Sequence, residues 1–253
     1  MKTIKVVFAL FITLLSFSCQ KEIASDSSSS SGANSGSSLF LVKTYTEDVT
    51  SSSIGHSVTT YNLTYDASGR LLSMVSASSS GDKFVYRYNS NNTFTMDIYN
   101  SNVVSIHSVF FINSFSLVDS IFKYNDTKDT STSKYLYNSS KQLVKQKEYD
   151  YTTARGAVLY NTYNYEYDSN GNAIKESDNS SVKTYDYYSN LTNNLSLGLI
   201  YFSPNKNLLK TTTYTSGGQT ETLNHTYTFN SNNRLSTEKI VASSGDVFIR
   251  TYN

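Results

Sequence analysis

The chain has 253 residues, of which 38% are hydrophobic and 16% charged, with 21 basic residues against 20 acidic ones. This near-neutral balance without a basic patch argues against a nucleic-acid partner and against electrostatic binding to an anionic membrane surface. Tyrosine (22) and phenylalanine (13) dominate the aromatic residues, tryptophan is absent and there is one proline. Such a composition is typical of a β-sheet protein.

The N-terminus has the order of an export signal. Lys2 and Lys5 form a short positive region, and residues 6–15 form an apolar segment that is too short to span a bilayer. Ser16-Phe17-Ser18, with small residues at 16 and 18, provides a cleavage zone directly before Cys19. We therefore expect residues 1–18 to be a signal peptide.

Cys19 is the only cysteine, so it has no partner for an intramolecular disulfide. Its setting resembles a bacterial lipoprotein signal, in which the cysteine becomes the lipidated first residue. In such signals the third residue before the cysteine is usually leucine, whereas here it is Ser16. Looser signals of this kind are similar to those of Bacteroidota-type lipoproteins. Residues 19–22 also resemble the Lys/acidic tag of surface-exposed lipoproteins. The resemblance implies lipid attachment at Cys19 and an outer-membrane location facing the cell surface or, alternatively, the periplasm; an ordinary secretory leader with an incidental cysteine is the other interpretation.

The next segment differs sharply in composition. Residues 25–38 are almost entirely Ser, Gly, Ala and Asn, which predicts a flexible tether that reaches roughly 20 Å by random-coil scaling. The expected organisation is a lipidated cysteine and tether over 19–38, followed by one folded domain over 39–253.

A seven-residue pattern recurs through this domain. Each copy begins with an aromatic residue, continues with turn-forming residues and usually ends on an apolar one; the copies are 65–71, 88–94, 137–143, 167–173, 202–208 and 229–235, with a degenerate one at 111–117. The pattern predicts a type I turn followed by a left-handed residue, a common hairpin connection. The fifth position should then have positive φ, and the residues there are Gly69, Asn92, Lys141, Gly171, Lys206 and Asn233. Pro204 falls at the second turn position, where its fixed φ is suitable.

Strands are expected between these turns. Alternation of aromatic and polar residues, as in residues 60–65, 84–88 and 163–167, indicates strands with one apolar and one polar face. A second class of turn, rich in Gly and Ser, lies between the copies of the first. We predict an all-β, antiparallel, up-and-down meander of about 14–16 strands, with the two turn classes at opposite ends. Without helices to cover it, the sheet should curl into a barrel or half-barrel; an extended curled ribbon is the alternative.

The copies at 65–71 and 167–172 resemble the YD repeat of Rhs-type shell proteins, although the few copies here argue against a shell. The chain is also similar to a family of Bacteroidota lipoproteins of unknown function with a porin-like fold. The matching segments are the Tyr-rich 184–188 and the Leu-Leu-Lys strand 207–210. The resemblance implies a fold and a cellular location, and it implies no catalytic residue.

No motif predicts a reaction, a cofactor or a metal site. His56, His107 and His225 are isolated in the sequence, and no metal-ligand, nucleophile or phosphate-binding pattern occurs. Residues 168–172 resemble part of a calcium loop, but the glycine is misplaced and the bidentate glutamate is missing. Glu148 and Asp150 share one strand face, as a glycosidase pair would, yet charged residues on a solvated strand face are much commoner.

We therefore expect a non-enzymatic, lipid-anchored binding or scaffold module, with the membrane as partner through its anchor. Tyrosines on a sheet suit a glycan or an apolar ligand, although they are more often the filling of the sheet's own interior. One alternative is a carrier that holds a lipid or other apolar molecule inside the curl. A membrane-spanning barrel has the same period-two pattern, and a glycan hydrolase would depend on Glu148 and Asp150 alone.

Overall fold

The computed structural model describes residues 41–79, 81–89, 92–125, 130–152, 156–193, 195 and 205–253. These residues form sixteen strands and no helix. The strands are β1 (Thr44–Ser51), β2 (Gly55–Tyr65), β3 (Leu71–Ser76), β4 (Lys83–Tyr88), β5 (Thr93–Asn100), β6 (Val103–Ile112), β7 (Val118–Asn125), β8 (Thr130–Tyr137), β9 (Leu143–Thr152), β10 (Gly156–Tyr167), β11 (Ala173–Ser177), β12 (Ser181–Thr192), β13 (Asn207–Ser216), β14 (Gln219–Phe229), β15 (Leu235–Ala242) and β16 (Val247–Tyr252).

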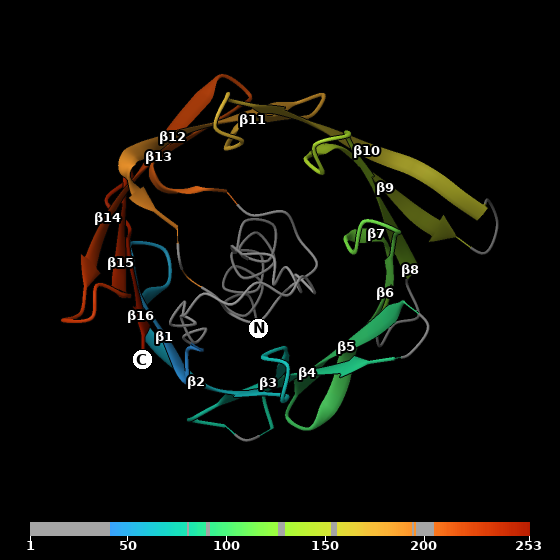
Figure 1. Cartoon of the computed structure of the whole chain (residues 1–253), viewed down its shortest axis with the longest axis horizontal. Coiled ribbons are helices and arrows are strands. Elements are labelled where there is room, and N and C mark those ends of the chain that lie inside the picture. Colours follow the sequence, from blue (N-terminus) through green and yellow to red (C-terminus); the bar gives the residue numbers. More distant parts are fainter. Residues whose placement is uncertain are drawn as a thin grey trace, which may run out of the picture.

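The strands close into one antiparallel barrel (Figure 1). Every strand pairs with its neighbours in the sequence, and β1 pairs with β16 through six residue pairs from Tyr45–Tyr252 to Thr50–Val247. The predicted all-β meander and its strand number are confirmed, and of the predicted shapes the closed barrel is the one found. Closure removes both sheet edges, which would otherwise expose unpaired backbone groups.

The two turn classes lie at opposite ends, as predicted, because an up-and-down meander alternates them. In the aromatic turns the side chain of the second residue accepts two backbone N–H groups, those two and four residues further on, at 2.8–3.1 Å. The accepting residues are Asp66, Asn113, Asn138, Asp168 and Asn230. Positive φ follows at Gly69, Asn92, Lys141, Gly171 and Asn233. The side-chain bonds thus hold the left-handed turn that the sequence pattern predicts.

Two details of the predicted register are wrong. In the degenerate copy positive φ falls on Ser116, so the turn begins one residue later than the predicted segment 111–117; Asn113 is the residue that can accept the two N–H groups. Lys206 is not among the described residues with positive φ. The side chain of Asn205 instead accepts the N–H of Ala173 at 2.8 Å, so this segment docks on the neighbouring turn. Pro204 lies outside the described residues.

A tyrosine clamp closes the open end of five hairpins. In each, a tyrosine beyond the last paired residue of the second strand donates its hydroxyl to the carbonyl at or just before the start of the first strand, over 2.6–2.9 Å. The pairs are Tyr65–Val42, Tyr88–Leu71, Tyr137–Val118, Tyr167–Leu143 and Tyr187–Ala173. Backbone pairing between the two strands has already ended at these points; β7 and β8, for example, stop at Ser120–Lys134. The hydroxyl therefore satisfies a carbonyl that the ladder leaves unpaired.

Buried apolar side chains point inward and gather on one side of the barrel. They belong mainly to β1–β7, with a few from β13, β15 and β16. Phe94 and Phe110 stack with ring centroids 4.2 Å apart, and Leu71 and Val118 are fully buried beside the aromatic turns. This packing covers the apolar strand faces that a single sheet would leave in water.

The clamps predict a specific loss of stability. Tyr137→Phe keeps the ring but leaves the carbonyl of Val118 without its donor, so the free energy of unfolding should fall by about 1–2 kcal/mol. Urea denaturation of the variant and the wild type measures the difference. Tyr149→Phe removes the hydroxyl of an outward-facing tyrosine and is the control, which should change stability much less. Equal effects of the two substitutions would contradict the role of the clamp.

Candidate functional site

The inner wall of the barrel has two different halves. Inward positions on β2–β7 are mostly apolar, as in Leu63, Met74, Met96 and Ile121. Inward positions on β8–β16 and β1 carry most of the buried or half-buried charged and amide groups; these are Gln146, Glu148, Asn161, Glu176, Lys183, His225, Glu238, Arg250 and Glu47. A barrel of sixteen strands encloses more space than its inward side chains fill. The polar half of this wall is the candidate site.

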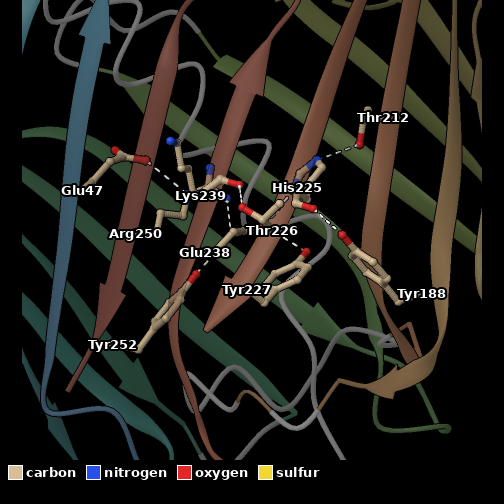
Figure 2. A network of polar contacts seen from close by, with 10 residues as sticks. All are labelled: Glu47, Tyr188, Thr212, His225, Thr226, Tyr227, Glu238, Lys239, Arg250 and Tyr252. Carbon is tan, nitrogen blue, oxygen red and sulfur yellow. Dashed lines mark hydrogen bonds and ion pairs between the residues drawn. The ribbon is translucent and has the colours of Figure 1, made fainter. Parts of the chain in front are cut away.

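Its centre is an ion network across the seam where the barrel closes (Figure 2). Arg250 on β16 lies between two carboxylates, with Nη1 3.0 Å from Glu238 Oε2 on β15 and Nε 3.4 Å from Glu47 Oε1 on β1. The three side chains are at most 10% exposed. Removing one member would leave a buried charge unpaired, which is strongly destabilising. The network therefore ties the last strands to the first.

His225 on β14 extends the network toward β13. Its Nδ1 lies 2.9 Å from Glu238 Oε1, and its Nε2 lies 3.3 Å from the hydroxyl of Thr212. An ionised carboxylate only accepts hydrogen bonds, so Nδ1 carries the proton toward Glu238. The carbonyl of His225 accepts the hydroxyl of Tyr188 at 2.9 Å. Figure 2 shows these groups facing one another across neighbouring strands.

Tyrosines surround the two carboxylates. Tyr227 and Tyr252 donate to Glu238 at 3.2 and 3.4 Å, and Tyr45 donates to Glu47 at 3.3 Å. Burial raises the pKa of all three phenols, and the neighbouring carboxylates raise them further although Arg250 opposes this. The tyrosines therefore stay protonated and act as donors.

The network holds Glu238 in its charged form. Burial by itself would raise the pKa of the Glu238 carboxyl, but the hydrogen bond from His225 and the charge of Arg250 outweigh it and lower the pKa to about 2. Burial would also lower the pKa of Arg250, yet the surrounding tyrosines and carboxylates raise it above its usual value. The arrangement binds internal charges to one another, and it presents no free nucleophile.

Smaller polar groups continue around the same half of the wall. Glu176 accepts Lys183 Nζ at 2.8 Å and the hydroxyl of Tyr185 at 3.1 Å. Glu148 accepts Gln146 Nε2 at 2.8 Å and the hydroxyl of Tyr160 at 2.6 Å. Each carboxylate is thus engaged by donors of its own or neighbouring strands.

The residues singled out from the sequence have separate positions. Glu148 and Asp150 share the inward face of β9, as predicted, but Asp150 is exposed while Glu148 is held by Gln146 and Tyr160. Asp168 caps its turn by accepting the N–H groups of Asn170 and Asn172, which is the turn interpretation of the calcium-like segment. Cys19 lies outside the described residues.

Each histidine lies beside a carboxylate of a neighbouring strand, which the sequence did not reveal. His56 and His107 are on the outer wall next to Asp48 and Asp97, at 2.9 and 2.5 Å, and His225 is inside. Across the ranges that the structure describes, no cluster of three metal-ligating side chains occurs. The sequence signal that could have placed Glu238 and Arg250 inside the barrel was the alternation along each strand. Glu238 lies two residues from the apolar Ile240, and Arg250 two residues from Tyr252, so each pair shares one strand face.

The outer wall is polar over most of its circumference. Outward positions of β14 are Thr220, Thr222, Asn224, Thr226 and Thr228. Ion pairs also lie on the outside, such as Lys175–Glu166 at 2.7 Å between β11 and β10 and Arg87–Asp97 between β4 and β5. A charge on a lipid-facing strand costs about 2–4 kcal/mol near the bilayer centre, so this wall suits water. Among the described residues no helix is long and apolar enough to cross a membrane.

The low pKa of Glu238 predicts a pH-dependent effect. The pKa of the carboxyl is near 4.5 in the unfolded chain and about 2 in the folded protein. Its contribution to the free energy of unfolding is therefore complete above about pH 4.5 and disappears as the pH falls through 2. Urea denaturation should show that the stability advantage of the wild type over Glu238→Gln shrinks by about 2–3 kcal/mol between about pH 6 and pH 2. Glu166→Gln, which alters an exposed carboxylate on the outer wall, is the control. A difference that does not change with pH would contradict the proposed charge state of Glu238.

The comparisons with known proteins concern the fold. A search of solved structures found a porin-like protein from Bacteroides uniformis, with a TM-score of 0.62 and 14% sequence identity over 84% of this chain and 96% of that chain. A scan against protein-family models and a search of curated proteins found no match. At this level of identity the likeness establishes the architecture: this chain has the barrel fold of that porin-like protein.

Proposed function

We propose that the protein is a non-enzymatic β-barrel that is anchored by a lipid on Cys19, stands in water at the outer-membrane surface and binds a ligand or partner. The observation that carries the proposal is the polar outer wall, with threonines on β14 and ion pairs such as Lys175–Glu166 where a spanning barrel needs an apolar band. The likeness to a porin-like protein supports a membrane or surface protein in general terms. The lipoprotein-like leader accounts for membrane attachment without a spanning barrel.

A non-enzymatic role agrees with the state of the inner carboxylates. Glu47 and Glu238 share Arg250, and Glu176 is paired with Lys183. Glu148, the candidate glycosidase residue, accepts two hydrogen bonds from its own barrel. These contacts stabilise the wall, and a catalytic pair would need two carboxyl groups free to face a substrate.

The anchor can be tested in cells. Cys19→Ala should abolish incorporation of a labelled fatty acid and move the protein from the detergent phase to the aqueous phase in a Triton X-114 partition. Ser30→Ala in the tether is the control and should remain in the detergent phase. A Cys19→Ala protein that stays with the membrane would support a spanning barrel and contradict the proposal, as would a wild-type protein that takes up no label.

A second candidate is a carrier of an amphipathic or apolar molecule inside the barrel. The observation that favours it is the two-sided inner wall, apolar on β2–β7 and polar around Glu238 and Glu176. A lipid would find an apolar surface for its chain and hydrogen-bonding groups for its head.

The carrier predicts a bound molecule. Protein with Cys19→Ala, purified from cells without detergent, should release a stoichiometric lipid that native mass spectrometry detects, and Met96→Glu on the apolar half should lower its amount. The matched change Thr95→Glu on the outward face of the same strand should not. A Cys19→Ala protein free of any small molecule would exclude the carrier and leave the surface-binding proposal intact.

A further inference from the structure

The outer wall carries an aromatic patch, formed by Phe122, Tyr124, Tyr149, Tyr151 and Leu159. Register places these residues in two adjacent rows on the outward face of β7–β10. One row runs Phe122–Thr132–Tyr149–Leu159, and the other contains Tyr124, Thr130 and Tyr151. Leu159, Tyr124 and Tyr151 are exposed, at 49%, 43% and 37%. The opposite wall has threonines at such positions, so this patch is a local feature.

The rings form a continuous surface. Phe122 contacts Tyr124 with centroids 4.8 Å apart and Tyr151 with centroids 5.6 Å apart, which joins β7 to β9 across β8. Thr132 on β8 lies between Phe122 and Tyr149, is 6% exposed, and its hydroxyl has no hydrogen-bond partner. A buried hydroxyl without a partner is destabilising by about 1–3 kcal/mol. The floor of the patch therefore contains a polar group that the barrel itself does not satisfy.

A lysine cluster, formed by Lys134, Lys145 and Lys147, borders the patch. Lys134 and Lys147 are direct cross-strand neighbours on β8 and β9, and Lys145 is the next outward residue of β9. The ammonium group of Lys134 lies 5.7 Å from the ring centroid of Tyr149, so the cluster and the patch are contiguous. The outward positions that pair β7 with β8 and β8 with β9 hold these three lysines and no carboxylate; the exposed Asp119, at the irregular start of β7, accepts the hydroxyl of Ser120.

Like charges that face each other across a sheet are destabilising, so folding does not account for this cluster. Elsewhere on the outer wall charges of opposite sign lie side by side, as in Lys175–Glu166 and Arg87–Asp97, and a single lysine such as Lys239 faces Thr226 and Ile249, not another lysine. None of the three lysines is within ion-pair distance of a carboxylate among the described residues. An anion from outside the barrel would supply the missing countercharge.

We infer that the aromatic patch and the lysine cluster bind an acidic polysaccharide. Sugar rings stack on Tyr and Phe side chains, whose hydroxyls add hydrogen bonds, and the carboxylates or sulfates of such a polymer meet Lys134, Lys145 and Lys147. The inference deepens the proposed function, because it names the ligand class of a surface-binding barrel and requires the outer wall to be in water.

The geometry favours a polysaccharide over a membrane and over a second copy of this chain as the binding partner of the patch. A membrane is met by apolar residues at several loop tips, whereas described tips here are mostly polar, such as Gly217–Gly218 and Ser243–Asp246. Phe115 and Val103 are exposed at or beside two other tips, away from the patch on the wall. A second copy of the chain docked through the same face would bring two lysine clusters into one interface. A long flexible anion lies along a flat wall without either conflict.

The test uses the full chain with Cys19→Ala and measures binding to polygalacturonate by calorimetry, with neutral dextran as the comparison polymer. We expect binding to polygalacturonate alone, and weaker binding as salt rises because the contact is partly ionic. Lys134→Gln with Lys147→Gln should weaken binding at least about tenfold, as should Tyr151→Ser. The matched controls are Lys210→Gln with Lys239→Gln, which remove the same charge from β13 and β15, and Val182→Ser on β12; these should bind like the parent.

Other results would overturn the inference. Absence of polygalacturonate binding by a protein that is released into water contradicts the ligand class and leaves the proposed function standing. Stronger binding to phosphatidylglycerol vesicles than to the polymer would assign the patch to a membrane, and a dimer in sedimentation that Tyr151→Ser dissociates would assign it to a second copy. A Cys19→Ala protein that is not released from the membrane would contradict the proposed function itself.

Discussion

The hydrogen bond from a tyrosine hydroxyl to a main-chain carbonyl at the open end of a hairpin is the constraint on which the barrel depends. Antiparallel strands diverge where their ladder ends, and the first carbonyl of the incoming strand then has no partner. Tyr88 satisfies Leu71, Tyr137 satisfies Val118 and Tyr167 satisfies Leu143. In these hairpins the tyrosine comes from one turn and the carbonyl from the preceding turn, so consecutive turns are fixed to each other. The repeat is therefore a device for joining hairpins as well as for making turns.

Because the sheet is closed, one face of every strand lines the interior of the barrel and the other face forms its outer wall. The inward face of β2–β7 packs apolar side chains against one another, while the inward face near the seam carries Glu47, Glu238 and Arg250. Arg250 contacts carboxylates on both sides of it, at the one place where, among the described strands, two that are distant in the sequence pair. Local hairpins need no such tie, because their turns set the register. The first and last strands have no turn between them, and the ion network with the Tyr45–Tyr252 contact supplies specificity there.

Sequence reasoning succeeded where the structure is local. The aromatic turns, their positive φ at Gly69 and Lys141, the strand number and the two ends of the meander follow from residues that are close together in the chain. It failed where a contact joins distant segments. Glu47 and Arg250 are 203 positions apart, and no spacing relates them. Lys206 departs from its pattern because Asn205 bonds to Ala173 in the preceding repeat. The clamps cannot be read from a sequence that shows only that an aromatic residue begins each repeat.

Stability explains the inner tyrosines and does not explain the outer ones. Tyr137 and Tyr227 have a buried ring and a hydrogen-bonded hydroxyl, and each occupies an inward position. Tyr124 and Tyr151 face out and expose about two fifths of their surface. Lys134 and Lys147 face each other beside them although any neutral pair would be more stable. The outer wall elsewhere carries threonines, ion pairs and single charges such as Lys239, whereas β7–β9 combine aromatic rings with lysines that face each other. A ligand with sugar rings and negative charge would contact both features.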